Sequence, residues 1–377
     1  MTRKITIIGT GFAGLAAAEK YRKLDGDAEI TIIGKQAEFV YLPSLIWIPS
    51  GKRKGSDIVV PLASYFARRN IKFHQGAATG IENDGRTVIT ENGKVDNDGL
   101  VIACGGRFIK KLPGIEHAIT PCEGIKSAEA IRDRLTALKP GSTVAVGFSG
   151  NPKETSAMRG GPMFEFLFGI DRQLRKEGRR NDIKMVFFCP APKPGIRLGE
   201  KAVEKLVERM KTQNIEIHTG HKLKKFEANK VTTEGGEFTA DLILFMPGMT
   251  GNKWFANSGL PISEGGLIKA NALCQVDGFN KVYVAGDSGS LPGPDWLPKQ
   301  AHMAELQAKA AAQNLHNELA GKPATEKFKT ELICIVDSLD KGALVYRTET
   351  RSLMLPNLRI LHWAKSIFEK LHMRQYR

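Results

Sequence analysis

The sequence predicts an α/β protein with two doubly wound parallel sheets, the first interrupted by the second, and an amphipathic helical tail. Three observations predict this fold. A strand, a glycine turn, a helix and a second strand open the chain, a new alternation of strands and helices begins near residue 142, and a strand typical of the first unit returns at residue 282. The expected domains are 1–141 together with 281–329, then 142–280, and the tail 330–377.

The individual elements follow from hydrophobic patterning. In the first unit we expect strands at 4–8, 29–33, 99–103 and 282–285, and helices at 14–24 and 300–319. In the second unit we expect strands at 143–147, 184–188, 215–218 and 242–246, and helices at 162–177 and 200–214.

Composition narrows the class of partner. The chain has 377 residues and a formal charge of +15, which favours anionic partners. Zinc-finger spacing, an RNA-binding aromatic signature and a concentrated basic arm are absent, so we expect an anionic membrane surface and no nucleic acid. The five cysteines are scattered, and neither a signal peptide nor an apolar run of roughly 20 residues is present. We therefore expect a cytoplasmic protein that contacts a membrane peripherally, from one side, and no metal site.

A glycine-rich loop at residues 9–14 is the strongest functional signal. Gly9 allows a sharp turn at the strand end, Gly11 lets a pyrophosphate approach the backbone, and Gly14 lets the helix pack on the strand. The following helix presents unpaired N–H groups to the phosphates. This loop, with Phe12 and Ala13, predicts a dinucleotide site, and a tight turn without a ligand is the alternative.

Two other strand ends extend the expected site. The second strand ends in Gly34 and Lys35, where an acid usually binds a ribose, so backbone, water or another residue would hold the ribose and Lys35 would contact a phosphate. The strand at 282–285 ends in Gly286 and Asp287, which places a carboxylate where the ribityl chain of a flavin would lie. Together with the glycine loop, this segment predicts bound FAD.

The equivalent loop of the second unit, residues 147–152, lacks the glycine pattern that cradles a dinucleotide. Pro152 also prevents a clean helix start there. Tight binding of NAD(P)H is therefore not expected, and the electron donor is expected to be something other than a nicotinamide.

Four segments resemble the sulfide:quinone oxidoreductase and flavocytochrome c sulfide dehydrogenase group of flavoproteins, and this resemblance covers nearly the whole chain. They are the stretch 39–47, the Gly-Pro motif at 161–166, the Pro-Lys helix start at 298–303, and the C-terminal helix at 362–370. The resemblance implies FAD, a cysteine pair that oxidises sulfide beside the flavin, and electron transfer to quinone or cytochrome.

The resemblance also implies roles for single residues. Cys334 matches the C-terminal redox cysteine of the family, and Cys122 matches an additional cysteine of some members. Their chemistry requires a lowered thiol pKa. Glu165 is a candidate proton carrier, and Lys299, at a helix N-terminus, is a candidate to stabilise the negative reduced flavin. The expected flavin-binding set is completed by Ser44, Ala78, Ala103, Cys104 and Gly105.

The chain departs from the family's pattern at three places. The central redox cysteine of the family lies just before the Gly-Pro motif, but residues 156–160 contain no thiol. An expected histidine is Lys126, and a second is absent near 195–198. Either Cys122 and Cys334 act together or another reductant is used, and Cys122 as an inert loop thiol is an equal alternative. Cys104 is expected beside the flavin loop, and Cys189 and Cys274 in packing.

The tail predicts a membrane-surface helix. Apolar residues recur at helical spacing, with basic residues around them; the apolar ones are Leu358, Ile360, Leu361, Trp363, Ala364, Ile367, Phe368 and Leu371, and the basic ones are Arg359, Lys365, Lys370, Arg374 and Arg377. A helix docked on the protein's own core or on a second subunit of a homo-oligomer is the alternative.

We therefore expect an FAD-dependent enzyme that oxidises sulfide or a related sulfur species and passes electrons to membrane quinone. A membrane-bound NADH:quinone dehydrogenase is a second enzymatic reading, which predicts rapid flavin bleaching by NADH. A flavin-containing partner protein that has lost catalysis is the third, supported by the missing cysteine and histidines.

Overall fold

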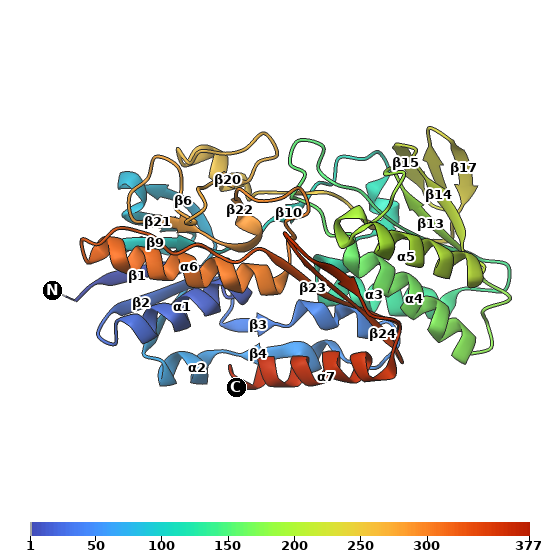
Figure 1. Ribbon diagram of the computed structural model, residues 1–377, viewed down its shortest axis with the longest axis horizontal. Coiled ribbons are helices and arrows are strands. Elements are labelled where there is room, and N and C mark those ends of the chain that lie inside the picture. The colour runs from blue at the N-terminus through green and yellow to red at the C-terminus, as the bar shows by residue number, and fades with distance from the viewer. Residues whose placement is uncertain (1) are drawn as a thin grey trace.

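The first unit is a five-stranded parallel sheet in the computed structural model, which describes residues 2–377 (Figure 1). Its strand order is β21-β9-β1-β2-β5. The strands are β1 (Lys4–Ile8), β2 (Glu29–Gly34), β5 (Ile71–Gln75), β9 (Gly99–Ile102) and β21 (Val282–Val284). The isoleucine-rich strands are buried because helices cover the sheet. Helices α1 (Phe12–Leu24) and α6 (Ala301–Leu319) pack against each other there.

The second unit is a separate parallel sheet with the order β11-β18-β12-β13-β14. Its strands are β11 (Ala118–Ile119), β12 (Thr143–Phe148), β13 (Lys184–Cys189), β14 (Glu216–Thr219) and β18 (Leu242–Met246). Its helices are α3 (Ile125–Ala137), α4 (Gly161–Lys176) and α5 (Glu200–Thr212). Since β21 returns to the first sheet after this unit, the predicted α/β class with an interrupted first unit is confirmed.

Short antiparallel elements surround the two sheets. They are β3 (Glu38–Val40) with β4 (Val59–Pro61), followed by helix α2 (Ala63–Arg68); β6 (Ala78–Glu82), β7 (Thr87–Thr90) and β8 (Gly93–Asp96); β10 (Arg107–Phe108) with β19 (Met249–Thr250); and β15 (Leu223–Glu227), β16 (Lys230–Thr233) and β17 (Gly236–Thr239). The strand β20 (Ile268–Lys269) pairs with β22 (Gly289–Ser290), which follows β21, so the chain is already in contact with the first unit before residue 281.

The C-terminal segment contains a sheet that the sequence patterns did not predict. Strands β23 (Glu331–Asp337), β24 (Gly342–Thr348) and β25 (Ser352–Met354) form it, and helix α7 (Arg359–Arg374) follows. β23 contacts both α4 and α6, so this sheet lies where the two units meet. Figure 1 shows α7 along the edge of the molecule near β4 and β24. Within residues 2–377, no helix is long and apolar enough to cross a bilayer.

Helix α7 is amphipathic as predicted, but its polar side faces the protein. The side chains of His362, Glu369 and Met373 are buried, whereas Trp363 is 66% exposed and Phe368 67% exposed. The other large apolar residues on the exposed side are Leu358, Ile360, Ile367 and Leu371. The alternative in which the apolar stripe docks on the protein's own core is therefore wrong, because ionic contacts hold the opposite side.

Candidate cofactor and redox site

The glycine loop between β1 and α1 is tightly packed at Gly9 and Gly14 and has free space at Gly11. Gly9 has φ +121°, and a Cβ there would lie 2.3 Å from the carbonyl oxygen of Ala103. A Cβ on Gly14 would lie 1.9 Å from the carbonyl oxygen of Gly9. By contrast, a Cβ on Gly11 would meet nothing within 4 Å. The loop thus has the shape that brings a phosphate to bare backbone at the start of α1.

A buried polar atom also points to a bound group. Ser44, in the short 3-10 helix Leu42–Trp47, is fully buried, and its Oγ has no hydrogen-bond partner among the residues that the structure describes. Leaving such a hydroxyl unsatisfied costs about 1–3 kcal/mol, which a bound acceptor would relieve. Gly105 has φ +71° and open space in front of its Cα. These features, together with the loop at Gly11, fit a dinucleotide cofactor.

Asp287 lies in the 3-10 turn Gly286–Ser288 at the end of β21, next to the glycine loop. A Cβ on Gly286 would lie 3.4 Å from that of Ala13, and the Gly286 N–H donates to the buried Gln307 side chain of α6 over 2.9 Å. The Asp287 carboxylate forms an ion pair with Arg159, which directly precedes the Gly160 cap of α4. The sequence interpretation missed Arg159, although a basic residue stands where the family's central thiol is missing.

Lys299 lies just before α6 and points at the same turn. Its Nζ donates to the carbonyl oxygens of Gly286, over 3.3 Å, and of Gly289. Burial lowers the pKa of Lys299 to about 8, although the Asp287 charge opposes this shift. A lysine with a pKa of about 8 is positively charged over a narrower pH range than the sequence-based expectation assumed.

The two candidate redox thiols do not have the lowered pKa that thiolate chemistry requires. Burial raises the pKa of Cys122 to about 11, and the Arg159 charge opposes this rise only in part. Burial raises the pKa of Cys334 to about 12, and the charge of Glu165 adds to this rise. Both thiols are free, in the 3-10 turn Pro121–Glu123 and in β23 respectively. The expectation of a lowered pKa is therefore wrong for these surroundings, because desolvation disfavours the thiolate.

A buried ion pair joins α4, β23 and α7 beside Cys334. The Glu165 carboxylate accepts from Lys365 of α7 and, over 2.9 Å, from the backbone N–H of Asp337. Burial raises the pKa of Glu165, and Lys365 opposes that rise. Cys334 lies against the start of α4, since a Cβ on Gly161 would be 3.9 Å from its Sγ. Glu165 and Cys334 are thus brought together, as a proton carrier and a redox thiol would need to be.

Some of the remaining predicted residues lie near the glycine loop, and others lie elsewhere in the fold. Ala103 is buried, Cys104 accepts from Asn252 over 3.4 Å, and burial raises the Cys104 pKa to about 11. Gly34 ends β2 below Thr10, whereas Lys35 is exposed. The others lie in packed positions: Phe12 against Phe39, Ala78 opposite Thr90 in β6, and Cys189 and Cys274 in the core.

The loop after β12 is long rather than tight. Residues 149–160 separate this strand from α4, and the buried Asn151 holds the loop by donating to the carbonyl oxygens of Met249, over 2.8 Å, and Gly265, over 3.1 Å. The helix therefore does not start at the strand end, where a second dinucleotide would meet its N-terminus.

Two interlocked doubly wound units and a glycine loop of this geometry are typical of dinucleotide-dependent oxidoreductases. Residues 3–308 match the pyridine nucleotide-disulphide oxidoreductase family, and the chain belongs to that family.

Individual relatives are more distant. The chain is 27% identical to the sulfide-quinone reductase of Aquifex aeolicus, over 98% of this chain and 90% of that protein. The crystal structure of the sulfide:quinone oxidoreductase from the same organism superposes with a TM-score of 0.90, covering 100% of this chain and 92% of the other. The type II NADH:quinone oxidoreductase of Staphylococcus aureus is 25% identical, over 91% of this chain and 90% of that protein. The resemblance recognised in the sequence is thereby confirmed.

Proposed function

We propose that the protein is an FAD-dependent, quinone-linked oxidoreductase at a membrane surface, and that its electron donor is sulfide or a related small sulfur species. The observation that carries this proposal is the set of elements around Gly11, Ser44 and Asp287. They supply an open glycine loop, an unsatisfied buried hydroxyl, and a carboxylate in the turn that packs against the loop. The relatives named for sulfide and for quinone support the donor and the acceptor.

The chain's own residues divide the work of the site. The N–H groups at the start of α1 bind the pyrophosphate, and Asp287 orients the ribityl chain once it exchanges its Arg159 partner for that ligand. Lys299 holds positive charge beside the turn that carries Asp287. FAD, when bound, supplies two-electron chemistry between donor and acceptor.

Cys334 and Glu165 supply the thiol and the acid–base group of this proposal. Cys334 is assigned as the thiol that meets the sulfur donor because it lies against Gly161 at the start of α4, and its raised pKa means that it reacts only after a base has removed its proton. Glu165 is the acid–base group beside this thiol, because burial raises the pKa of its carboxyl and its ion-pair partner Lys365 opposes that rise. Cys122 contributes a second thiol near Arg159.

The exposed apolar side of α7 supports the proposed contact with a membrane. Six large apolar side chains on or next to the helix are exposed, and arginine and lysine residues flank them. Such a surface suits the interface of an anionic bilayer, where quinone is available. This association is peripheral, and a homo-oligomer that covers the same face is the competing arrangement.

One alternative donor has specific support. The relatives named for NADH include the Staphylococcus aureus protein and, at 14% identity and a TM-score of 0.76, NDH2 from Plasmodium falciparum with NADH bound. The 149–160 loop of this chain argues against NADH, because α4 does not begin at the end of β12.

An anaerobic titration decides between these readings. Sulfide and then NADH are added to the FAD-loaded protein, and the oxidised flavin band is followed. We expect sulfide to bleach the band and NADH to leave it unchanged. Rapid bleaching by NADH would establish the alternative donor, and bleaching by neither would indicate a partner protein without catalysis.

Substitution of the thiol tests the residue assignment. In Cys334→Ser, bleaching by sulfide should be strongly slowed, while the flavin content stays that of the unmodified protein. Cys189→Ala is the matched control, because Cys189 is buried in the second sheet away from this site. Unchanged bleaching in Cys334→Ser would remove this residue from the mechanism.

A further inference from the structure

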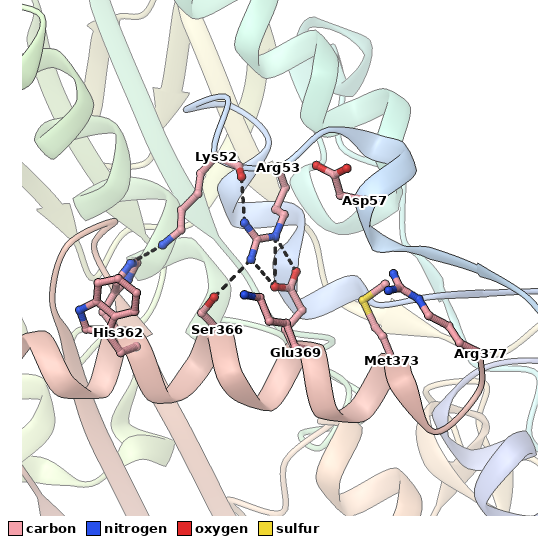
Figure 2. A pocket seen from close by; sticks show the side chains of 10 residues that line it. Lys52, Arg53, Asp57, His362, Ser366, Glu369, Met373 and Arg377 are labelled. Carbon is pink, nitrogen blue, oxygen red and sulfur yellow. Dashed lines mark hydrogen bonds and ion pairs between the residues drawn. The ribbon is translucent and has the colours of Figure 1, made fainter.

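A pocket lies between α7 and the loop that carries Lys52 and Arg53, outside the proposed cofactor site (Figure 2). Its volume is about 500 Å³, in the range of small-ligand pockets. The loop supplies Lys52, Arg53 and Asp57, and the helix and its C-terminal extension supply His362, Trp363, Ser366, Glu369, Lys370, Met373 and Arg377.

The pocket is basic. Four basic side chains and two carboxylates line it. One carboxylate is already neutralised, because Glu369 accepts from Arg53 in a bidentate pair with distances of 2.5 to 3.1 Å. The other, Asp57, accepts the backbone N–H of Lys54 over 2.7 Å. A net positive pocket remains, which favours an anion.

Three of the basic side chains that line the pocket form no ion pair with a carboxylate of the described residues. Lys370 and Arg377 form no ion pair with any residue in the range 2–377. Lys52 donates one hydrogen bond, to Nε2 of His362, and its ammonium group has further N–H donors. The other nitrogen of His362, Nδ1, is bonded to Asp337 over 2.5 Å. Lys52 is held at His362, about 20 Å along the helix from Arg377, so the basic groups that can share one phosphate are those of Lys370 and Arg377.

The position of the pocket identifies the source of the phosphate. Trp363 lines the pocket and also belongs to the exposed apolar side of α7, together with Ile367 and Phe368. If that side entered the acyl region of a bilayer, the pocket would lie beside it at headgroup level, where tryptophan and basic residues are favoured. A free phosphate would not need this neighbouring apolar surface.

We propose that this pocket binds the phosphodiester of an anionic phospholipid headgroup, held by Lys370 and Arg377. The inference rests on the proposed membrane association and makes it specific. Charge alone would attract any anionic surface, whereas a pocket between α7 and the 52–57 loop selects a phosphate at one place on the protein.

Vesicle binding by the full FAD-loaded chain tests the pocket. Phosphatidylcholine vesicles that contain either phosphatidylglycerol or oleate are prepared at equal surface potential, and binding is measured by flotation. The unmodified protein should prefer the phosphatidylglycerol vesicles. In K370Q/R377Q, binding to them should fall by at least about tenfold, to the level of the oleate vesicles.

The matched control removes two positive charges from α7 at positions outside the pocket. Arg359 and Arg374 are exposed residues of α7 that do not line this pocket. R359Q/R374Q should therefore keep the preference for phosphatidylglycerol and lose only a few-fold in affinity, about what diffuse attraction supplies.

The outcomes separate the two proposals. Equal loss in both double variants, or no preference for phosphatidylglycerol over oleate, would overturn the headgroup site while leaving membrane association intact. Millimolar inorganic phosphate that abolishes the preference would show a site for free phosphate and would also overturn it. An unmodified protein that binds no vesicle at all would refute membrane association itself.

Discussion

Glycines that look alike in the sequence have different tasks at the scale of single residues. Gly9 and Gly14 are required by the fold, because a Cβ at either would overlap backbone atoms. Gly11 has backbone angles that any residue adopts and open space in front of it, so the fold does not require a glycine there. A glycine kept where the chain tolerates a side chain indicates a ligand that needs the room.

This difference predicts the behaviour of Gly11→Ala. The variant should fold, at a cost of about 1 kcal/mol for the changed helix cap, but its FAD content should fall by at least about tenfold because the methyl group occupies the pyrophosphate position. Absorbance of purified protein and a urea unfolding curve measure the two effects. Gly26→Ala, at an equally open glycine in an exposed turn, should change neither. A yellow Gly11→Ala protein would place the cofactor elsewhere.

Burial also sets the direction of the pKa shifts of the titratable residues in the site. It raises the pKa values of Cys122 and Cys334 and lowers that of Lys299. The sequence shows which residue types are present, but the direction of each shift depends on how many atoms surround the group and which charges are near it.

At the scale of elements, α7 is attached through polar and charged side chains rather than through its apolar stripe. Lys365 pairs with Glu165 of α4, Glu369 with Arg53, and His362 with Asp337 of β23. The Asp337 carboxylate also accepts the Trp47 indole N–H over 3.0 Å. These contacts leave the apolar stripe for another partner.

The Lys365–Glu165 pair yields a stability prediction. Lys365→Met leaves the buried Glu165 without its partner and should lower the free energy of unfolding by about 3–5 kcal/mol, whereas the double variant Lys365→Met/Glu165→Gln should recover most of it. Urea unfolding measures both. Lys370→Met, an exposed residue of the same helix, should stay within about 0.5 kcal/mol. A single variant as stable as the original would mean that the pair does not anchor α7.

The end of α7 should respond to acid. His372 packs against the rings of Phe12, Phe39 and Tyr41, and burial lowers its pKa to about 4. The unfolded chain, with an ordinary histidine pKa of about 6.5, binds this proton first as the pH falls. The stability contribution is therefore complete above pH 6.5 and is lost on going down to pH 4, by about 3 kcal/mol at most.

The check compares two proteins at two pH values. Unfolding free energies at pH 7 and pH 4.5 should differ less in His372→Phe than in the unmodified protein, because phenylalanine cannot take up the proton. Glu305 lies 3.3 Å from His372, and burial raises the pKa of this carboxyl. Identical acid sensitivity in the two proteins would exclude His372 as the titrating group.

At the scale of the whole molecule, one edge of the protein combines exposed apolar side chains with the basic pocket. The apolar residues lie on α7 and the pocket lies between this helix and the 52–57 loop, while the glycine loop sits at the sheet of the first unit. The Glu165–Lys365 pair joins α7 to α4 of the second unit, so the same edge is tied to both units of the fold.

This arrangement predicts a surface variant that separates membrane binding from stability. Ile367→Ser/Phe368→Ser removes two exposed side chains, so unfolding should change by less than about 1 kcal/mol, while vesicle binding should weaken at least about tenfold. Flotation with vesicles and sedimentation without them give the two readouts. Ile196→Ser, at an exposed apolar residue outside α7, is the control. A change from oligomer to monomer with unaltered vesicle binding would assign the helix to a second subunit.

The sequence by itself determined the α/β class, the interrupted first unit, the glycine loop and an amphipathic helix in the C-terminal tail, because each depends on local periodicity or on a short spacing of glycines. Only the tertiary structure decided what these elements face. It paired Arg159 with Asp287 across 128 positions of sequence, added the sheet β23–β25, and turned the polar side of α7 inward. A polar stripe of His362, Lys365 and Glu369 is present in the sequence, but periodicity shows two faces of a helix without showing which one meets the protein. That choice depends on buried charges supplied by Glu165, Asp337 and Arg53, which are distant along the chain and adjacent only once it has folded.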